Sequence, residues 1–467
     1  MKQKSEPIHA RLCVALILAV TTPGSARCAE TTGGRDGTPW PAMRALGRDL
    51  PVNRGEPSKH EDTPAMHTQS QHEPEGVLTL LRALELALLH SPELVASSHT
   101  VWAAEGNAKQ QGARPNPEIG LDASEFAGSG ARQGFDAAET SVSLSQSFEL
   151  GGKRAKRQRV ARLEARLAGW DYEAKRMDIL AETQKAFVDV LHAQGQLALV
   201  DSLLSVVEEM RKAAAERVKS GKVSLLEETK AGVEVASVRI ARERARQELA
   251  TARKRLAASW GGTAPVFTEA AGDLEITMDV APLDKFSPLL GEIPEVARWN
   301  EEVALARESL ALAKAERVPD LGVSAGISRF EEDGTTAGML GVSVPLPLFD
   351  RNAGGILSAE HQATRAELEQ HAAELRAMND LVEAHSRLEM ARMEALAIKT
   401  ELLPGAQQAF DAAQAGYREG KFGQLEMLDT RRTLSEARSR YLEVLAAYHK
   451  AVADVERLTG TPINTIQ

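Results

Sequence analysis

Glu426 and Asp429 are acidic residues at a spacing that could create a local negative potential. Residues three positions apart share one face of a helix, so both carboxylates would point the same way. Several copies of such a pair at a narrow opening would attract cations and repel anions. An acidic pair on a single helix is more often a solvated surface, so the pair alone leaves both interpretations open.

The sequence lacks the motifs of the common catalytic centres. It has no Gly-rich phosphate loop, no His-x-x-x-His pair with a neighbouring base and no serine in a nucleophile elbow. Acidic neighbours such as Glu227-Glu228 and Glu301-Glu302 fall on helical stretches where they face different sides, and solvation accounts for them. We therefore expect no catalytic residue, no bound metal and no cofactor.

The composition favours long helices and argues against nucleic acid as a partner. The 467 residues are 43% hydrophobic and 26% charged but only 4% aromatic, which is low for an enzyme of this size. The formal net charge is -10, so the chain has no basic excess with which to neutralise phosphates.

Residues 1–28 have the order of a secretory signal peptide. Basic residues precede the apolar run 12–20, which is too short to span a bilayer, and small residues follow it. Cleavage after Ala26 or after Cys28 would suit signal peptidase, and the second choice leaves a mature chain without cysteine. The bulky Arg27 disfavours, without excluding, a lipid anchor on Cys28.

Residues 29–77 are predicted to form a flexible polar arm. They are rich in Gly, Pro, Ser and Thr and show no apolar periodicity, so they cannot bury enough surface to offset the entropy of ordering. The arm carries His60, His67 and His72. Scattered linker histidines are a better interpretation than a metal site, because no cysteine or close histidine spacing accompanies them.

The chain contains an internal duplication. Pro92-Glu93-Leu94 recurs as Pro294-Glu295-Val296, displaced by 202 residues, and Gly221-Lys222 recurs as Gly420-Lys421, displaced by 199. Such self-similarity predicts two copies of one structural unit. We place the copies at 78–262 and 291–461, joined by a connecting segment at 263–290 and followed by a short tail at 462–467.

Each half predicts helix, strand, loop, strand, very long helix, tight turn and long helix. Lys153 to Glu216 contains no proline and would reach about 95 Å as a helix. Its apolar residues follow the three-four spacing of a coiled-coil seam: Val160, Leu163, Leu167, Trp170, Ala174 and Met177. The second half repeats the rod from Ala353 to about Gly416, with a kink expected at Pro404, which has no N–H to donate.

Four short segments alternate between apolar and small polar residues, as β-strands with one apolar face do. The apolar positions are Ile119, Leu121 and Ala123; Val142, Leu144 and Phe148; Leu321, Val323, Ala325 and Ile327; and Leu340, Val342, Val344, Leu346 and Leu348. This pattern fits a membrane barrel and equally a half-buried soluble sheet. A sheet in a membrane must close, and bacterial barrels have about eight strands or more. Four strands per chain would therefore need two copies for eight strands or three for twelve.

The sequence resembles a known protein family. The duplication, the serine-alternating strands and the run 417–429, with Tyr417-Arg418-Glu419-Gly420-Lys421 followed by Leu425-Glu426-Met427-Leu428-Asp429, resemble the TolC-type outer membrane efflux proteins. The likeness covers nearly everything from Leu78 to Gly460. Three further motifs resemble the outer-membrane subunit of cobalt-zinc-cadmium resistance pumps: Arg114-Pro115-Asn116-Pro117, Glu149-Leu150-Gly151-Gly152-Lys153-Arg154 and Pro345-Leu346-Pro347-Leu348-Phe349-Asp350-Arg351-Asn352.

The resemblance implies a mostly α fold with a small β part. Long antiparallel coiled-coil helices would form an α-barrel tunnel in the periplasm, and four strands per chain would contribute to a 12-stranded transmembrane β-barrel in the outer membrane of a homotrimer. The implied function is the exit duct of a tripartite RND-type efflux system that exports heavy-metal cations. The implied partners are a periplasmic adaptor protein, an inner-membrane RND pump and outer-membrane lipid.

The resemblance also implies roles for individual residues near the periplasmic entrance. Glu426 and Asp429 match acidic positions that line it, so a trimer would carry two carboxylate rings. Glu227 and Tyr417 match positions that help to hold the entrance shut. The basic partner in that constriction would fall at Phe422, so this chain departs from the family there.

The turns between the long helices are expected to dock the adaptor. The residues concerned are Gly221, Lys222, Gly420 and Lys421. A helix-turn-helix needs a residue that tolerates a left-handed backbone at the reversal, and this need explains both glycines without any partner.

Three alternative functions remain open at the level of the sequence. The channel could serve drugs or other small molecules in place of metals. A periplasmic adaptor would be expected to carry a single helical hairpin flanked by small β domains and no full duplication. A periplasmic coiled-coil structural protein would have no need of four strands with small polar residues on one face.

Overall fold

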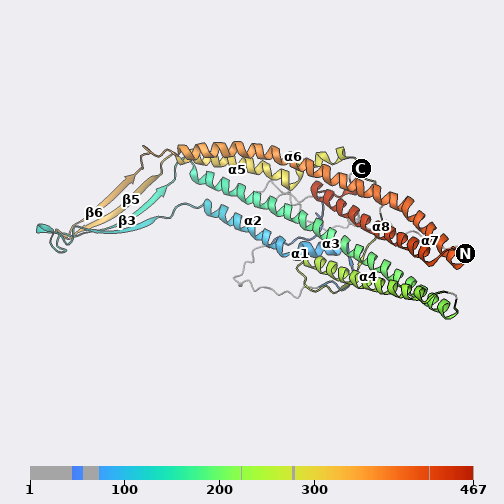
Figure 1. Cartoon of the computed structure of the whole chain (residues 1–467). Helices are drawn as coiled ribbons and strands as arrows, with labels where there is room; N and C mark the ends of the chain where they lie inside the picture. Colours follow the sequence, from blue (N-terminus) through green and yellow to red (C-terminus); the bar gives the residue numbers. More distant parts are fainter. Residues whose placement is uncertain (1–44, 56–72, 222, 276–278, 420, 466–467) are drawn as a thin grey trace, which may run out of the picture.

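The computed structural model describes residues 45–55, 73–221, 223–275, 279–419 and 421–465. The predicted signal peptide, the three histidines of the arm, Lys222 and Gly420 lie outside the described residues. The molecule is elongated, with a small sheet at one end and long helices running away from it (Figure 1). The prediction of a mostly α chain with a small β part is confirmed.

Both halves contain the predicted order of elements. The first half comprises α1 (Leu80–His90), α2 (Pro92–Gln111), β2 (Glu118–Ser124), β3 (Glu139–Phe148), α3 (Lys153–Lys219) and α4 (Leu225–Ala258). The second half comprises α5 (Pro294–Glu316), β5 (Leu321–Phe330), β6 (Thr336–Ser343), α6 (Ala353–Ala397), α7 (Leu403–Arg418) and α8 (Gln424–Thr459).

The two rods differ in continuity. Helix α3 has 67 residues without interruption, a length of about 100 Å. Its counterpart is divided into α6 and α7 by a π-helical turn at Ile398–Leu402, and Pro404 lies in the first turn of α7. Because Pro404 has no N–H to donate one turn back, the kink expected there takes the form of this wider turn.

Shorter helices flank the rods along their length. Helix α3 packs against α2 and α5 in the half of the molecule near the sheet, and against α4 and α8 in the far half (Figure 1). Helix α8 also packs against α6 and α7. Two helical hairpins therefore form the far end, α3/α4 (the first hairpin) and α7/α8 (the second hairpin).

The four long strands form one antiparallel sheet in the order β2-β3-β5-β6. Its register aligns apolar residues from all four strands in one row, Ile119, Leu144, Ala325 and Leu340. Rows of mainly Ser and Gly lie between the apolar rows, so the register gives the whole sheet one apolar face.

The last strand is shorter than the sequence pattern indicated. Strand β6 ends at Ser343, so the predicted continuation through Val344 to Leu348 is wrong. Pro345 and Pro347 have no N–H with which to continue a ladder, and the segment leaves the sheet there.

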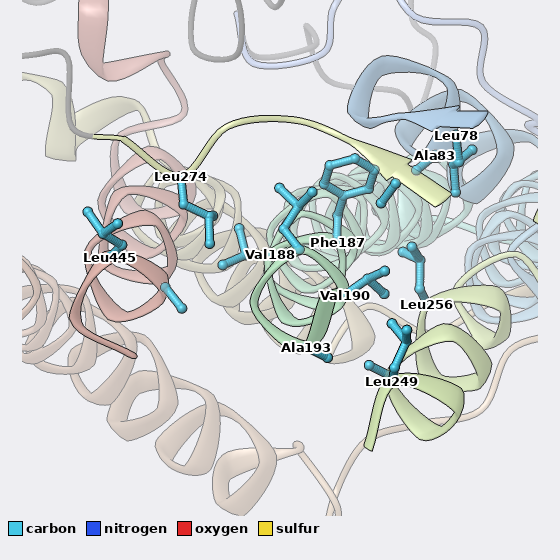
Figure 2. Packing of buried hydrophobic residues seen from close by; sticks show 14 of the residues in the cluster. Leu78, Ala83, Phe187, Val188, Val190, Ala193, Leu249, Leu256, Leu274 and Leu445 are labelled. Atoms are coloured by element: carbon cyan, nitrogen blue, oxygen red, sulfur yellow. The ribbon is translucent and has the colours of Figure 1, made fainter. Parts of the chain in front are cut away.

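The main core lies where the middle of α3 meets a two-stranded parallel sheet that the sequence did not predict. Strand β1 (Gly76–Thr79) pairs with β4 (Phe267–Ala271). Figure 2 shows Phe187 and Val188 of α3 between Leu256 of α4 and Leu445 of α8. The connecting segment 263–290 supplies β4 and the short 3-10 helices η4 (Leu283–Lys285) and η5 (Ser287–Glu292).

Part of the predicted flexible arm is held against the bundle. Leu46 is buried, its N–H donates to the Gly460 carbonyl, and its carbonyl accepts from Arg176. Arg176 in turn forms a buried bidentate pair with Glu173. For residues 45–55 the prediction of a flexible arm is therefore wrong, because Leu46, Leu50 and Val52 pack on the bundle and these backbone contacts fix the segment.

The C-terminal tail is also packed as far as the structure describes it. Ile463 is buried, and its N–H donates to the carboxylate of Glu456, which also accepts from Gln184. Burial raises the pKa of Glu456 to about 7. The buried carboxylate of Glu456 therefore links the tail to helices α3 and α8.

Candidate membrane-spanning sheet and channel entrance

The two faces of the four-stranded sheet differ in chemistry and in exposure. On one face Ile119 and Leu340 are 75% and 80% exposed. On the other face Ser141 and Ser328 are 8% and 1% exposed. The apolar (outer) face is thus the more exposed of the two, an arrangement that suits a barrel with lipid against it and water against the serine (inner) face.

The length of the strands fits a membrane. Strands β3 and β5 have 10 residues each, and a tilted strand of this length covers the roughly 25 Å apolar band of an outer-membrane barrel. At its two edges, β2 and β6 each pair with a single neighbour in the sheet. A sheet in lipid cannot leave such edges unpaired, so these strands require partners from other chains.

The tip of the first hairpin is built on a left-handed glycine. Gly221 has φ of +72°, and its N–H donates to the Val218 carbonyl just after α3 ends. A Cβ at this position would meet nothing within 4 Å. The glycine is therefore required by the backbone conformation and not by crowding.

The tip of the second hairpin is fixed by a contact that the sequence did not reveal. The carbonyl of Gly416 accepts from the N–H groups of both Lys421 and Phe422. The ring of Phe422 lies over Gly416, where an added Cβ would come within 2.2 Å of it. Lys421 is exposed and forms an ion pair with Glu419 at 2.6 Å. Phe422, which stands where a basic residue was expected, therefore packs its ring against Gly416.

The two predicted entrance carboxylates lie one turn apart at the start of α8. Both side chains are exposed. The Oε2 atom of Glu426 accepts from the Gly423 N–H at 2.6 Å, which caps the N-terminus of α8. Asp429 lies in the same shallow groove, together with Leu203 of α3 and Glu234 of α4. Glu426 therefore has a structural role in addition to its charge.

Tyr417 of the second hairpin contacts Arg217 of the first hairpin, whereas the basic partner of the constriction was expected at position 422. The guanidinium of Arg217, near the end of α3, lies 5.1 Å from the centre of the Tyr417 ring. Such a cation–π contact contributes about 0.5–1 kcal/mol when exposed. Glu227 is half-buried in the first turn of α4. The structure therefore assigns Tyr417 an inter-hairpin contact with Arg217, and the role of Glu227 stays a prediction.

Sequence reasoning missed a second link between the hairpins. Arg431 of α8 is 6% exposed and donates to the carboxylate of Glu234 on α4 at 2.6 Å. Its Nε–H is buried without a hydrogen-bond partner among the described residues. The available signal was the position of Arg431 in the apolar seam of α8, between Met427 and Leu434.

These features together define an outer-membrane channel protein. An incomplete sheet with an apolar outer face continues into long helices, of which α3 reaches about 100 Å, and the second hairpin carries acidic residues near its tip. The family model described as outer membrane efflux protein matches residues 83–262 and 287–461. The chain belongs to this family.

Curated relatives include two metal-resistance proteins of Cupriavidus metallidurans. The chain is 34% identical over 385 residues to the cobalt-zinc-cadmium resistance protein CzcC, covering 82% of this chain and 90% of the relative. It is 29% identical over 284 residues to the nickel and cobalt resistance protein CnrC, covering 61% and 67%.

Solved structures share the fold at low sequence identity. CusC, whose structures concern folding and transmembrane channel formation, has a TM-score of 0.71 at 16% identity, covering 90% of this chain and 98% of that one. The CmeC outer membrane channel of Campylobacter jejuni has a TM-score of 0.67 at 15% identity, covering 82% and 85%.

Proposed function

We propose that this chain is the outer-membrane exit duct of a tripartite RND-type efflux system and that it exports heavy-metal cations. The observation that carries the metal assignment is the 34% identity to CzcC over 82% of the chain. The duct itself catalyses no reaction: an inner-membrane pump supplies the energy, and a periplasmic adaptor opens the entrance.

The proposed homotrimer is supported by surfaces that one chain leaves uncovered. Among the described residues, strands β2 and β6 pair along one edge each, and three copies of the sheet would close a 12-stranded barrel. Helix α3 contains an 18-residue stretch with mean hydropathy 1.3 that is long and apolar enough to cross a membrane, yet only 22% of it is buried within the chain. Since α3 belongs to the helical bundle, this apolar surface suits contact with a neighbouring subunit.

Helix α4 supports the same assembly. Its residues Leu226, Val233 and Ile240 are 58%, 66% and 69% exposed and recur every seven positions. Apolar residues at this spacing lie on one stripe of the helix and supply one of the two apolar positions of each heptad in a coiled-coil seam. Within the chain α4 packs mainly on α3, so the free seam is suited to the second hairpin of the next subunit.

The entrance roles follow from the trimer. Three copies of Glu426 and Asp429 would form two carboxylate rings that select for cations. The contact between Tyr417 and Arg217 supports a closing role for Tyr417, and Glu227 is proposed to assist. The proposed adaptor-docking residues of the two tips are Gly221, Lys222, Gly420 and Lys421.

The test is metal export in a strain that lacks this chain and expresses the cognate adaptor and pump. Restoring the chain should lower cellular zinc, cobalt and cadmium and raise resistance to them. A matched variant with the heptad seam broken, Val233→Asp with Ile240→Asp, should fail to restore export. If metal levels stay unchanged while a drug or dye is expelled, the alternative substrate class is correct and the metal assignment is wrong.

The oligomeric state has a separate test. Purified protein in mild detergent should have the mass of three chains of 50.4 kDa each, about 150 kDa less three signal peptides. A monodisperse monomer by light scattering would contradict the shared barrel.

A further inference from the structure

Every junction between the four-stranded sheet and the helices carries an exposed arginine. They are Arg114 before β2, Arg154 after β3, Arg317 before β5 and Arg351 after β6. Each lies four to eight residues from a strand end. In the part of the chain that the structure describes, none of the four forms an ion pair, although Arg351 donates to the Pro347 carbonyl. The sheet is therefore bordered on its helical side by four exposed arginines that lack an ion-pair partner among the described residues.

The carboxylates at the same junctions contact residues other than the four arginines. Asp320 pairs with Lys153 at 2.7 Å, and Glu149 pairs with Arg157. Glu118 lies in the row of Ser145 and Ser324 on the inner face of the sheet. Of the remaining two, Asp350 accepts from the Asn352 N–H and Glu316 accepts from the Asn352 side chain. Asn352 is neutral, so these two carboxylates keep their charge. Across residues 114–118, 149–157, 316–320 and 350–351, seven Lys and Arg residues still outnumber five Asp and Glu residues, which leaves an excess of two positive charges per chain for a group outside it.

An exposed apolar rim accompanies this charge. Leu346, Leu348 and Phe349, between β6 and α6, are 75%, 64% and 100% exposed, and Phe148 at the end of β3 is 49% exposed. Aromatic and aliphatic side chains next to long basic side chains are typical of a membrane interface, where the apolar part enters the lipid and the cation reaches the headgroups.

The opposite end of the sheet has the other charge. The β5–β6 turn contains Glu331, Glu332 and Asp333, all exposed, and Glu331 pairs with Arg329. An acidic turn repels phosphates, and the junction arginines attract them. The charge distribution therefore distinguishes the two membrane surfaces that the sheet would contact.

We infer that the junction arginines bind phosphate groups of anionic phospholipids in the periplasmic leaflet of the outer membrane. The apolar rim enters the same leaflet, and the two features together set the depth of the barrel. This inference rests on the proposed trimeric barrel, in which twelve such arginines would border the membrane. It gives a role to an arginine in each of the motifs 114–117, 149–154 and 345–352, for which the channel function alone gives no reason.

The test uses the intact trimer in mild detergent and measures bound lipid by native mass spectrometry. The probes are phosphatidylglycerol and phosphatidylcholine with identical acyl chains. A cation near a membrane surface contributes about fivefold in affinity for anionic lipid, so the wild type should prefer phosphatidylglycerol at least tenfold. The junction variant combines Arg114→Gln, Arg154→Gln, Arg317→Gln and Arg351→Gln, and should bind both lipids nearly equally.

Two matched variants separate charge from general damage. Replacing the same four arginines by lysine should keep the preference, because charge is retained. A control set of exposed basic residues on the periplasmic helices should also keep it: Arg211→Gln, Lys212→Gln, Arg244→Gln and Arg376→Gln. If the junction glutamine variant does not assemble, the pairs Arg114/Arg317 and Arg154/Arg351 are replaced separately, and each should lose part of the preference.

The outcomes are distinguishable from failure of the proposed function. A wild-type trimer that conducts ions but shows no preference for phosphatidylglycerol overturns the lipid inference alone. Equal loss in the control set overturns it as well, and so does tighter binding of lipopolysaccharide than of phosphatidylglycerol at the junction. A wild-type protein that neither trimerises nor conducts would refute the proposed channel itself.

Discussion

Neutralising the two entrance carboxylates tests their charge, provided that their structural role is preserved. Replacing Glu426 by Ala would remove the hydrogen bond from the Gly423 N–H that caps α8, at a cost of about 1 kcal/mol. Glu426→Gln keeps an acceptor oxygen at the cap. Asp429 is exposed, so Asp429→Asn is a conservative partner. We therefore choose the double variant Glu426→Gln with Asp429→Asn.

The expected size of the effect follows from six carboxylates around one axis. At about 8 Å and an effective dielectric constant of about 80, each contributes about 0.5 kcal/mol to a monovalent cation. Six such charges, screened roughly threefold at physiological salt, give about 1 kcal/mol. This free energy corresponds to about a fivefold enrichment of monovalent cations and about a thirtyfold enrichment of divalent cations.

The assay is single-channel recording in planar bilayers. The double variant should lose severalfold in cation-over-anion permeability, read from the reversal potential in a salt gradient, and should lose block by multivalent cations. A control pair with the same spacing on α6, Asp380→Asn with Glu383→Gln, should change neither. An unchanged reversal potential together with unchanged block in the entrance variant would show that these carboxylates do not line the entrance.

Three further predictions concern the tips, the tail and the ordered arm. Gly221→Val with Gly420→Val should abolish efflux and leave the trimer mass unchanged, because a β-branched residue at the φ of +72° of Gly221 distorts a turn that is far from the sheet (Figure 1); full efflux would place adaptor docking elsewhere. The raised pKa of Glu456, about 7, means that the free energy of unfolding should fall as pH rises from about 4.5 to 7. In the wild type the free energy of unfolding should be about 3 kcal/mol lower at pH 8 than at pH 5, and Glu456→Gln should remove this difference. If the difference persists in the variant, other groups cause it. Arg176→Met removes the cation that forms a buried bidentate pair with Glu173 and should cost roughly 3–5 kcal/mol in thermal unfolding. Adding Glu173→Gln should recover most of that loss, and a single variant as stable as the wild type would contradict the role of the pair.

Local pattern was sufficient for the elements whose residues decide their own conformation. The proline-free stretch from Lys153 predicted α3 to within a few residues of its end, and Pro404 marked the interruption of the second rod. The alternating residues predicted four strands. Pattern failed beyond Ser343, where apolar residues still alternate but Pro345 and Pro347 cannot pair.

Long-range contacts accounted for most of what the sequence did not reveal. Leu46 is one of a few apolar residues in a polar arm; it is buried in a cluster with Leu84 and Leu180, and its carbonyl accepts from Arg176, 130 residues away in the sequence. The ion pair between Arg431 and Glu234 joins residues 197 apart. Neither pairing is predictable locally: the position of Arg431 in the seam of α8 is visible in the sequence, but nothing near either residue identifies its distant partner.

The sequence by itself determined the duplication, the long helices, the alternating strands and the need for more than one chain to close a barrel. These follow from periodicity and strand number, which depend only on neighbouring residues. The tertiary structure alone decided the register that gives the sheet one apolar face, the seating of Phe422 on Gly416 and the gathering of junction arginines at one end. Register and juxtaposition arise from packing between segments far apart in the chain, and composition does not encode that geometry locally.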